Sequence, residues 1–260
     1  MISGTAVGIA AVLLSLVMAL AWWVVISSGR SGWADTFWSY GTGLVGVIAV
    51  WWAEGGAPAG RGLLVMALLA LWALRLGTHI ARRTLSGGDD PRYAELRRGW
   101  GERYRSQLFL FLQIQAAASL VLVVAVLAAA GNPAPLGLGD MLGVAIALLA
   151  IAGEAVSDAQ LRAFKANRAN AEGVCDVGLW SLSRHPNYFF EWLYWLAYPA
   201  IGIGLAYPWG WLTLLAPAMM YWLLVHVSGI PLLEAHMLRS RGDRFGAYQQ
   251  RVRAFWPVPK

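Results

Sequence analysis

The stretch "TAVGIAAVLLSLVMALAWWVVIS", residues 5–27, decides the fold class because it contains no charged side chain and is followed by similar stretches. A helix of about 20 apolar residues crosses the hydrocarbon core of a bilayer. Further apolar runs of spanning length lie near residues 37–54, 63–83, 107–130, 139–161, 189–206 and 209–232. The sequence therefore predicts an all-α polytopic membrane protein, a seven-transmembrane-helix bundle in one domain over residues 1–260 with a short cytosolic C-terminal tail.

Composition and charge support this fold class and predict an orientation. Hydrophobic residues make up 58% of the chain and charged residues 13%, which is typical of a polytopic membrane protein. Arg61 is the single basic residue in the even-numbered connections, 55–62, 131–138 and 207–210. By the positive-inside rule we expect the N-terminus outside and the C-terminus in the cytoplasm. The net charge of +6 is assigned to this orientation, and no nucleic-acid partner is expected.

The cysteine and the histidines limit which disulfides and metal sites the chain can form. The single cysteine, Cys175, cannot form a disulfide within the chain, and no two of the four histidines form a metal-binding pair with an acidic partner on a helix. The chain also has no P-loop, no GxGxxG after a strand and no GxSxG motif. We therefore expect no metal site, and a nucleotide would have to be held without a soluble Rossmann domain.

Cationic residues gather at the end of the third apolar run, "LWALRLGTHIARR". Arg75, His79, Arg82 and Arg83 are spaced by four, seven and eight residues, so a helix places them on one face. An ionisable group at membrane depth costs about 2.5–3.5 kcal/mol and usually faces a cavity or a partner. This face is suited to an anion, although Arg82 and Arg83 would also serve as an ordinary cytoplasmic anchor.

A second charged face lies at the end of the fifth run, "GEAVSDAQLRAFK". Glu154, Asp158, Arg162 and Lys165 are spaced by four, eight and eleven residues. Such pairs could simply stabilise an exposed helix by about 0.2–0.5 kcal/mol each. Because Glu154 and Asp158 lie close to the bilayer, we favour a functional site.

Two further carboxylates lie at the ends of predicted helices. Glu54 precedes a Gly-rich turn, where it is either a helix cap or a group that hydrogen-bonds a substrate carbonyl and donates a proton. Pro231 is expected to break or kink the last helix, and Glu234 follows within one turn, which directs its carboxylate to the cytoplasmic mouth of the bundle. The residues alone leave the role of Glu54 open.

The segment "SRHPNYFFEW", residues 183–192, places several hydrogen-bonding side chains directly before an apolar run. Pro186 suits the first turn of a helix, and Asn187 and Glu191 then lie one turn apart on one face. We expect this face to contact a ligand. Arg184 and His185 lie outside the helix, where they meet a phosphate or ribose or have a plain interfacial role.

Several motifs together resemble the bacterial DUF1295 branch of the steroid 5α-reductase family. They are "LRLGTHIARR…GGDDPRY" at 74–93, "EAVSDAQLRAFK" at 154–165, "GLWSLSRHPNYFFEW" at 178–192, "SGIPLLE" at 228–234 and a "Y…FWP" tail. The resemblance covers residues 35 to 257. The HPNY segment alone is less specific, because sterol C14 and C24 reductases and isoprenylcysteine carboxyl methyltransferases carry related versions.

The resemblance implies a seven-helix reductase of a bacterial inner membrane that takes NADPH from the cytosol and a steroid or related lipid from the membrane. The implied reaction is reduction of the Δ4 double bond of a 3-oxo-steroid, with the developing charge on the C3 oxygen met by Glu54 and His79. His79 stands where the family has a tyrosine. The implied cofactor-binding residues are Arg82, Arg92, Tyr93, Glu154, Asp158, Arg162, Lys165, Arg184, His185, Asn187, Tyr188, Glu191, Glu234, His236 and Tyr248.

Three alternatives stay open. The enzyme could reduce another alkene, as sterol C14 and C24 reductases do. It could be an S-adenosylmethionine-dependent methyltransferase of the isoprenylcysteine type, against which the seven predicted spans and the SGIPLLE segment count. It could also be a non-catalytic lipid-binding or transport protein in which the charged residues form structural ion pairs.

Overall fold

The computed structural model describes residues 3–87, 90–170 and 173–260. These residues form helices and connecting turns, with no β-strand among them beyond two isolated bridges. The all-α prediction is therefore confirmed. The chain divides into two compact units, one of Met1–Val144 with Leu196–Ala216 and one of Ala145–Trp195 with Pro217–Lys260. The predicted single domain thus contains two units, each with its own packing.

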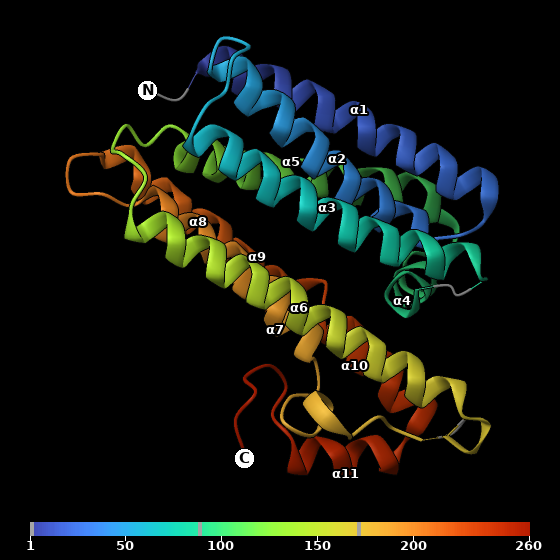
Figure 1. Ribbon diagram of the computed structural model, residues 1–260. Coiled ribbons are helices and arrows are strands. Elements are labelled where there is room, and N and C mark those ends of the chain that lie inside the picture. The colour runs from blue at the N-terminus through green and yellow to red at the C-terminus, as the bar shows by residue number, and fades with distance from the viewer. Residues whose placement is uncertain (1–2, 88–89, 171–172) are drawn as a thin grey trace. The chain divides into compact units, whose positions relative to one another are not determined.

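The first unit is built on four long helices that lie side by side in Figure 1. Polar pairs join them within their apolar surfaces. Ser15 donates to Gln113 (2.7 Å) between α1 and α5, and Thr42 donates to Ser119 (2.9 Å) between α2 and α5. Each such bond contributes about 0.6 kcal/mol inside a membrane bundle. The four helices are α1 (Gly4–Ser28), α2 (Gly32–Ala53), α3 (Arg61–Leu85) and α5 (Tyr104–Ala130).

Small residues on α2 let it lie close to α3. A Cβ at Gly43 would be 2.2 Å from the Cβ of Ala73, and a Cβ at Gly46 would be 2.4 Å from a methyl carbon of Leu69. These glycines are required for close approach and not for an unusual backbone angle. In membranes, where apolar burial drives little association, such contact between backbones holds helices together.

A buried ion pair joins the start of α3 to the connection that follows α5. Arg61 donates from Nε and Nη2 to the two carboxylate oxygens of Asp140 (both 2.7 Å), near the start of α6 (Leu138–Ala166). It also donates to the backbone carbonyls of Asn132, Ala134 and Pro135. Arg61, the single basic residue of the even-numbered connections, therefore has a structural role.

The structure contains five helical segments that are long and apolar enough to cross a membrane, in the part of the chain that it describes. They are Gly4–Ser28, Arg61–Leu85, Pro91–Ala130, Leu138–Ala166 and Pro208–Arg241. These segments make the protein an integral membrane protein. The predicted run 37–54 lies within α2, which is helical over its length but is not among the five.

The predicted span 189–206 is not a single helix. Its residues divide between α7 (Pro186–Trp195) and α8 (Ala197–Gly202), of 10 and 6 residues. At 1.5 Å per residue these are about 15 and 9 Å long, each too short for the hydrocarbon core. Pro199 has no N–H to donate to the carbonyl of Trp195, which explains the break at this point.

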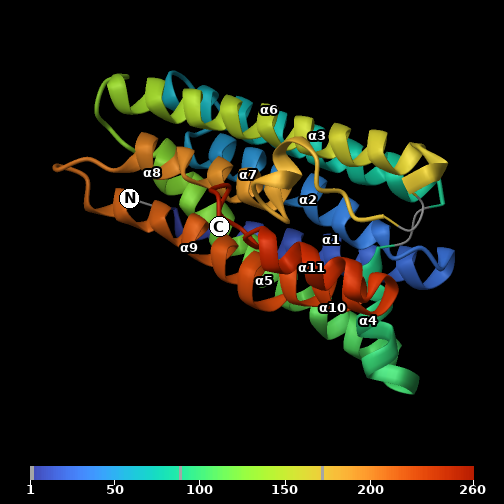
Figure 2. The same ribbon diagram turned by 90° about the horizontal axis from the view of Figure 1, so that it is seen from below.

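The second unit combines the later part of α6 with α7 and the C-terminal helices. The predicted run 209–232 begins in the first unit with the 3-10 segment Pro208–Leu214 and continues as α9 (Leu215–Trp222) and one π-helical turn, Leu223–Val227. The predicted break near Pro231 is confirmed, because α10 (Ile230–Arg241) starts there. Figure 2 shows α11 (Asp243–Arg251) next to α10, joined to it at Gly242.

Candidate functional site

The HPNY segment of the second unit is held by a buried network centred on Glu234 of α10. Arg184 donates from Nε (2.8 Å) and Nη2 (3.1 Å) to the two oxygens of this carboxylate. Its Nη1 donates to the backbone carbonyls of Gln249 and Val252. The guanidinium therefore joins the chain before α7 to α10 and to the end of α11.

His185 belongs to the same network. Its Nε2 lies 2.9 Å from Oε1 of Glu234, and its ring is stacked on Tyr188 with 5.5 Å between the centroids. Burial lowers the pKa of His185, while the hydrogen bond and charge of Glu234 act in the opposite direction. The ring is therefore neutral near pH 7, with the proton on Nε2 facing the carboxylate.

The C-terminal tail closes this network. The backbone N–H of Arg184 donates to the carbonyl of Arg253 (2.9 Å), and the hydroxyl of Ser183 donates to the carbonyl of Phe255 (2.9 Å). The phenol of Tyr248 donates to the carbonyl of Trp180, and burial raises its pKa well above the ordinary value. These bonds fix residues 180–185 before α7 begins.

Four residues that were predicted to contact the cofactor are thus parts of this scaffold: Arg184, His185, Glu234 and Tyr248. Their hydrogen bonds run to one another, to the backbone of the tail and to the carbonyl of Trp180, which differs from the predicted contacts with the cofactor. Nδ1 of His185 is buried and has no hydrogen-bond partner among the described residues. Sequence reasoning missed Gln249, which donates from Nε2 to Glu234 (2.7 Å). No motif in the sequence marks this glutamine, because its role depends on a partner fifteen residues away.

A different set of predicted residues lies on α7. The helix begins at Pro186, as predicted, so Asn187 and Glu191 lie one turn apart. Asn187 and Tyr188 are half-buried, whereas Glu191 is buried and accepts from Nε1 of Trp195 (3.0 Å). Oδ1 of Asn187 accepts from the backbone N–H of Tyr188 (3.1 Å), while its Nδ2 donates to no side chain or carbonyl among the described residues.

The acidic residues of α6 belong to the same unit. Glu154 and Asp158 are each only 5% exposed, while Arg162 and Lys165 farther along the helix are exposed. The ring of Phe190 packs directly on Gly153, where a Cβ would be 2.3 Å from it, so α6 and α7 are in close contact here. The structure therefore places Glu154 beside the helix that carries Asn187 and Glu191.

The predicted catalytic pair of the first unit is not brought together. Glu54 lies against Gly62 at the start of α3, and Oε2 accepts from the backbone N–H of Ala59 (3.2 Å). His79 lies on the same helix 17 residues beyond Gly62, which corresponds to about 25 Å along the axis. One carbonyl oxygen cannot contact both side chains. The sequence left two roles open for Glu54, a cap or a proton donor to a substrate carbonyl. The structure shows it as a cap of the turn between α2 and α3.

The remaining predicted residues of the first unit lie at the other end of its helices. Arg92 donates to Asp90 (Nε to Oδ1, 3.0 Å) and forms an ion pair with Asp35 of α2, which also accepts from the hydroxyl of Tyr93 (2.9 Å). Arg92 and Tyr93 thus dock α4 (Pro91–Trp100) on α2, which differs from the predicted contact with the cofactor. Sequence reasoning missed Asp35, although it is the single acidic residue in that apolar helix.

Asp90 completes this junction as the N-cap of α4. Burial by itself would raise its pKa, but the cations of Arg92 and Arg83 hold that pKa well below its ordinary value. Arg83 donates to Asp90 (2.6 Å), while its neighbour Arg82 is exposed. Arg83 therefore acts in a structural ion pair. His236, the last predicted residue, is half-buried on α10 of the second unit.

The fold and these contacts define the class of protein. It is an all-helical integral membrane protein with buried carboxylates and with an HPNY segment that is held by hydrogen bonds to the C-terminal tail. The chain belongs to the DUF1295 family, described as a protein of unknown function, whose sequence model matches residues 21–252. No curated protein and no solved structure matches the chain significantly. Among the described residues, no group of three His, Cys, Asp or Glu side chains is placed to hold a metal ion.

Proposed function

We propose that this protein is an NADPH-dependent membrane oxidoreductase of the steroid 5α-reductase type. Its reaction would be reduction of the Δ4 double bond of a 3-oxo-steroid or of a related unsaturated lipid. The proposal is supported by the motif resemblance and, above all, by the amide of Asn187, whose Nδ2 is left available on α7 near buried carboxylates. Its polar neighbours Arg184 and His185 are already occupied in the scaffold.

The residues of the second unit fit the chemical groups of NADPH, which would supply the hydride. The amide of Asn187 can both donate to and accept from a carboxamide. Carboxylates such as Glu154, Asp158 and Glu191 suit ribose hydroxyls, as acidic residues do in other dinucleotide sites. The exposed cations Arg162 and Lys165 on the following turns of α6 suit phosphate oxygens.

The group that polarises the substrate carbonyl remains a prediction from the sequence. We assign it to His79 alone, because Glu54 hydrogen-bonds the backbone of the turn between α2 and α3. An imidazole can donate a hydrogen bond to a developing enolate oxygen and pass a proton to it.

The proposal includes seven membrane crossings with the N-terminus outside. The connections before and after α2 are short, residues 29–31 and 54–60, so α2 returns along the bundle between α1 and α3. If α1 and α3 both cross the membrane, α2 crosses it too. The pair α7 and α8 would supply the further crossing as two short helices.

A binding experiment tests the cofactor. Purified protein in detergent is titrated with NADPH and, separately, with S-adenosylmethionine, and the thermal unfolding midpoint is followed. We expect NADPH to raise the midpoint and Asn187→Ala to weaken this binding about tenfold, which corresponds to about 1.4 kcal/mol. Asn167→Ala, on an exposed side chain of the same unit, is the matched control. Stabilisation by the methyl donor without stabilisation by NADPH would contradict the proposal.

An activity experiment tests the reaction. Testosterone or progesterone is supplied with NADPH, and the product is followed by mass spectrometry for the gain of two hydrogens. Activity on another alkene substrate but on no 3-oxo-Δ4-steroid would move the assignment to a sterol or other lipid reductase.

A further inference from the structure

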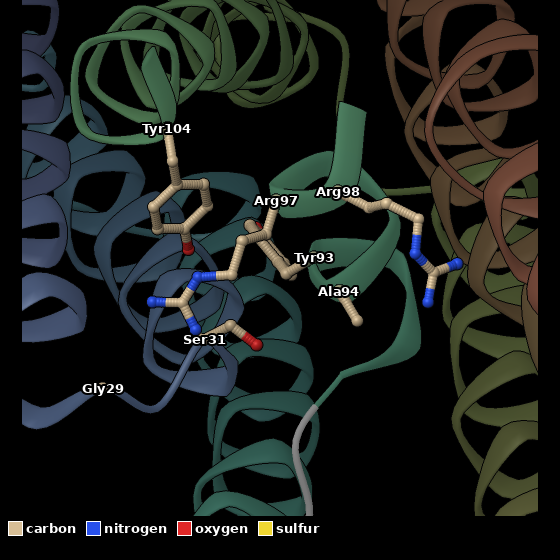
Figure 3. Close-up of a pocket in the computed structure, with 7 residues that line it drawn as sticks. All are labelled: Gly29, Ser31, Tyr93, Ala94, Arg97, Arg98 and Tyr104. Carbon is tan, nitrogen blue, oxygen red and sulfur yellow. The ribbon is translucent and has the colours of Figure 1, made fainter. Parts of the chain in front are cut away.

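A cavity of about 250 Å³ opens at one end of the first unit, beside α4. Figure 3 shows its lining residues, which come from the α1–α2 turn, from α4 and from the start of α5. They are Gly29, Ser31, Tyr93, Ala94, Arg97, Arg98 and Tyr104. None of the residues on α6 and α7 that the proposal above assigns to NADPH lines this cavity. Tyr93, which the resemblance implied for the cofactor, does line it, but its hydroxyl donates to Asp35.

Arg97 gives the cavity a positive charge in a fixed place. Its guanidinium lies 4.7 Å from the centroid of the Tyr104 ring, and in Figure 3 it reaches toward Ser31. Arg92 and Arg98 are paired with carboxylates, whereas Arg97 has no ion-pair partner in the described part of the chain. Stacking on an aromatic ring holds the guanidinium without using its hydrogen-bond donors. The donors of Arg97 therefore remain available to an anion.

The charge around the cavity favours an anionic ligand. Residues 92–105 contain five arginines, at positions 92, 97, 98, 103 and 105, and two glutamates, at positions 95 and 102. Arg98 is paired with Glu95, and Arg92 with Asp35 and Asp90. With these pairs set aside, Arg97, Arg103 and Arg105 outnumber Glu102 in this segment. A ligand that carries a positive ammonium group would be repelled by this excess of cations.

The exposed apolar side chains nearest the cavity indicate the depth at which it would lie in a membrane. Trp23 on α1 (60% exposed) lies six residues before Gly29, and Leu110 on α5 (55% exposed) lies six residues after Tyr104. At 1.5 Å per residue these lipid-facing side chains are about 9 Å from the cavity along each helix. The apolar surface of the bundle therefore gives way to arginines at the level of the cavity, as expected where acyl chains meet headgroups.

We propose that this cavity binds the phosphate group of an anionic phospholipid headgroup, with Arg97 as the main contact. The volume supports a headgroup, because it is below the range of about 300–1,000 Å³ occupied by larger organic ligands. The lipid chains would lie along the exposed apolar side chains of α1 and α5. This binding is independent of the proposed reductase activity.

The test uses the full-length protein, delipidated in detergent, and native mass spectrometry of bound lipid. The probes are short-chain phosphatidylglycerol, short-chain phosphatidylcholine, inorganic phosphate and NADPH as a competitor. Variant Arg97→Gln removes the proposed contact. Variant Arg103→Gln removes the same charge from an exposed position of the same segment, outside the cavity lining, and serves as the matched control.

We expect phosphatidylglycerol to bind more tightly than phosphatidylcholine, and Arg97→Gln to lower its affinity about five- to tenfold. Arg103→Gln is expected to leave that affinity within about twofold. Because Arg97 is exposed and makes no buried hydrogen bond in the described structure, its variant is expected to keep the thermal unfolding midpoint of the wild type.

Three results would overturn the proposal. Equal binding of the two lipids, or equal loss in the two variants, would mean that lipid adheres to the basic surface without using the cavity. Binding of inorganic phosphate as tight as that of phosphatidylglycerol, and equally dependent on Arg97, would mean a site for free phosphate. Displacement of the lipid by NADPH would assign the cavity to the nucleotide.

Discussion

At the scale of single residues, hydrogen bonds divide the HPNY segment into two groups. Arg184 and His185 are bound to Glu234 and hold the segment in place. Asn187 lies just beyond them, with an amide nitrogen that is not used in the described structure. Residues that are adjacent in the sequence therefore have different roles, and those roles follow from which distant partner each side chain reaches.

His185 predicts a pH dependence of stability. Burial lowers its pKa from the ordinary value of 6.5, so below that pH the unfolded chain binds more protons than the folded chain. The free energy of unfolding is thus highest above pH 6.5 and falls as pH decreases through the window below it. We expect the thermal unfolding midpoint in detergent to decrease between about pH 7.5 and 5.5.

Substitution identifies the group responsible. His185→Gln is expected to reduce this pH dependence, because glutamine does not titrate. His226→Gln changes an exposed histidine and should leave the dependence as in the wild type. An unchanged slope in His185→Gln would show that another group titrates.

Glu54 yields a second prediction at this scale. Its carboxylate accepts a backbone N–H of the α2–α3 turn, and the amide oxygen of glutamine can accept the same bond. We expect Glu54→Gln to change stability by less than about 0.5 kcal/mol and to retain steroid turnover, and Glu54→Ala to cost about 1 kcal/mol through loss of the cap. Chemical unfolding and product formation measure the two effects. Loss of turnover in a stable Glu54→Gln variant would restore a catalytic role.

At the scale of elements, the contacts of each helix decide which substitutions it accepts without loss of packing. The α2–α3 contact depends on glycines, while the break between α7 and α8 depends on a proline without an N–H. The sequence predicted the position and apolar character of both regions. It did not predict the break, because composition near 189–206 is mostly apolar and hydropathy does not register a single missing donor.

The α2–α3 contact predicts a position-dependent effect of alanine. In Gly43→Ala the new Cβ would lie 2.2 Å from the Cβ of Ala73, so the helices must separate. We expect a loss of about 1–3 kcal/mol in the free energy of unfolding, as for overpacked cores. The control is Gly8→Ala in α1, where no atom lies within 4 Å, and alanine there is expected to be neutral or slightly stabilising. Equal effects at the two positions would refute this packing argument.

At the scale of the whole molecule, each unit is held together by its own buried polar contacts. The first unit has the Arg61–Asp140 pair, and the second has the network around Glu234. The resemblance to a reductase family assigned site residues to both units, and the structure has a buried polar network in each, around Asp35 and around Glu234. It also assigned a shared role to Glu54 and His79, which the length of α3 excludes.

The Arg61–Asp140 pair predicts non-additive effects. Both side chains are less than 10% exposed, so removal of one leaves a buried charge without its partner. We expect Arg61→Met to cost about 3–5 kcal/mol and the double variant Arg61→Met/Asp140→Leu to recover part of this loss. A double-mutant cycle measured by chemical unfolding in detergent checks the coupling. Additive losses would show that the two residues act separately.

The sequence by itself determined the helical class, the membrane association and the charged faces, because each follows from local periodicity and composition. The faces of Glu154 with Asp158 and of Asn187 with Glu191 both lie on helices as predicted. Only the tertiary structure decided which polar residues serve as scaffold. Those partners lie far apart in the chain, 50 residues for Arg184 and Glu234 and 58 for Asp35 and Tyr93. Local pattern carries no information about such pairs, because they form only when the helices pack.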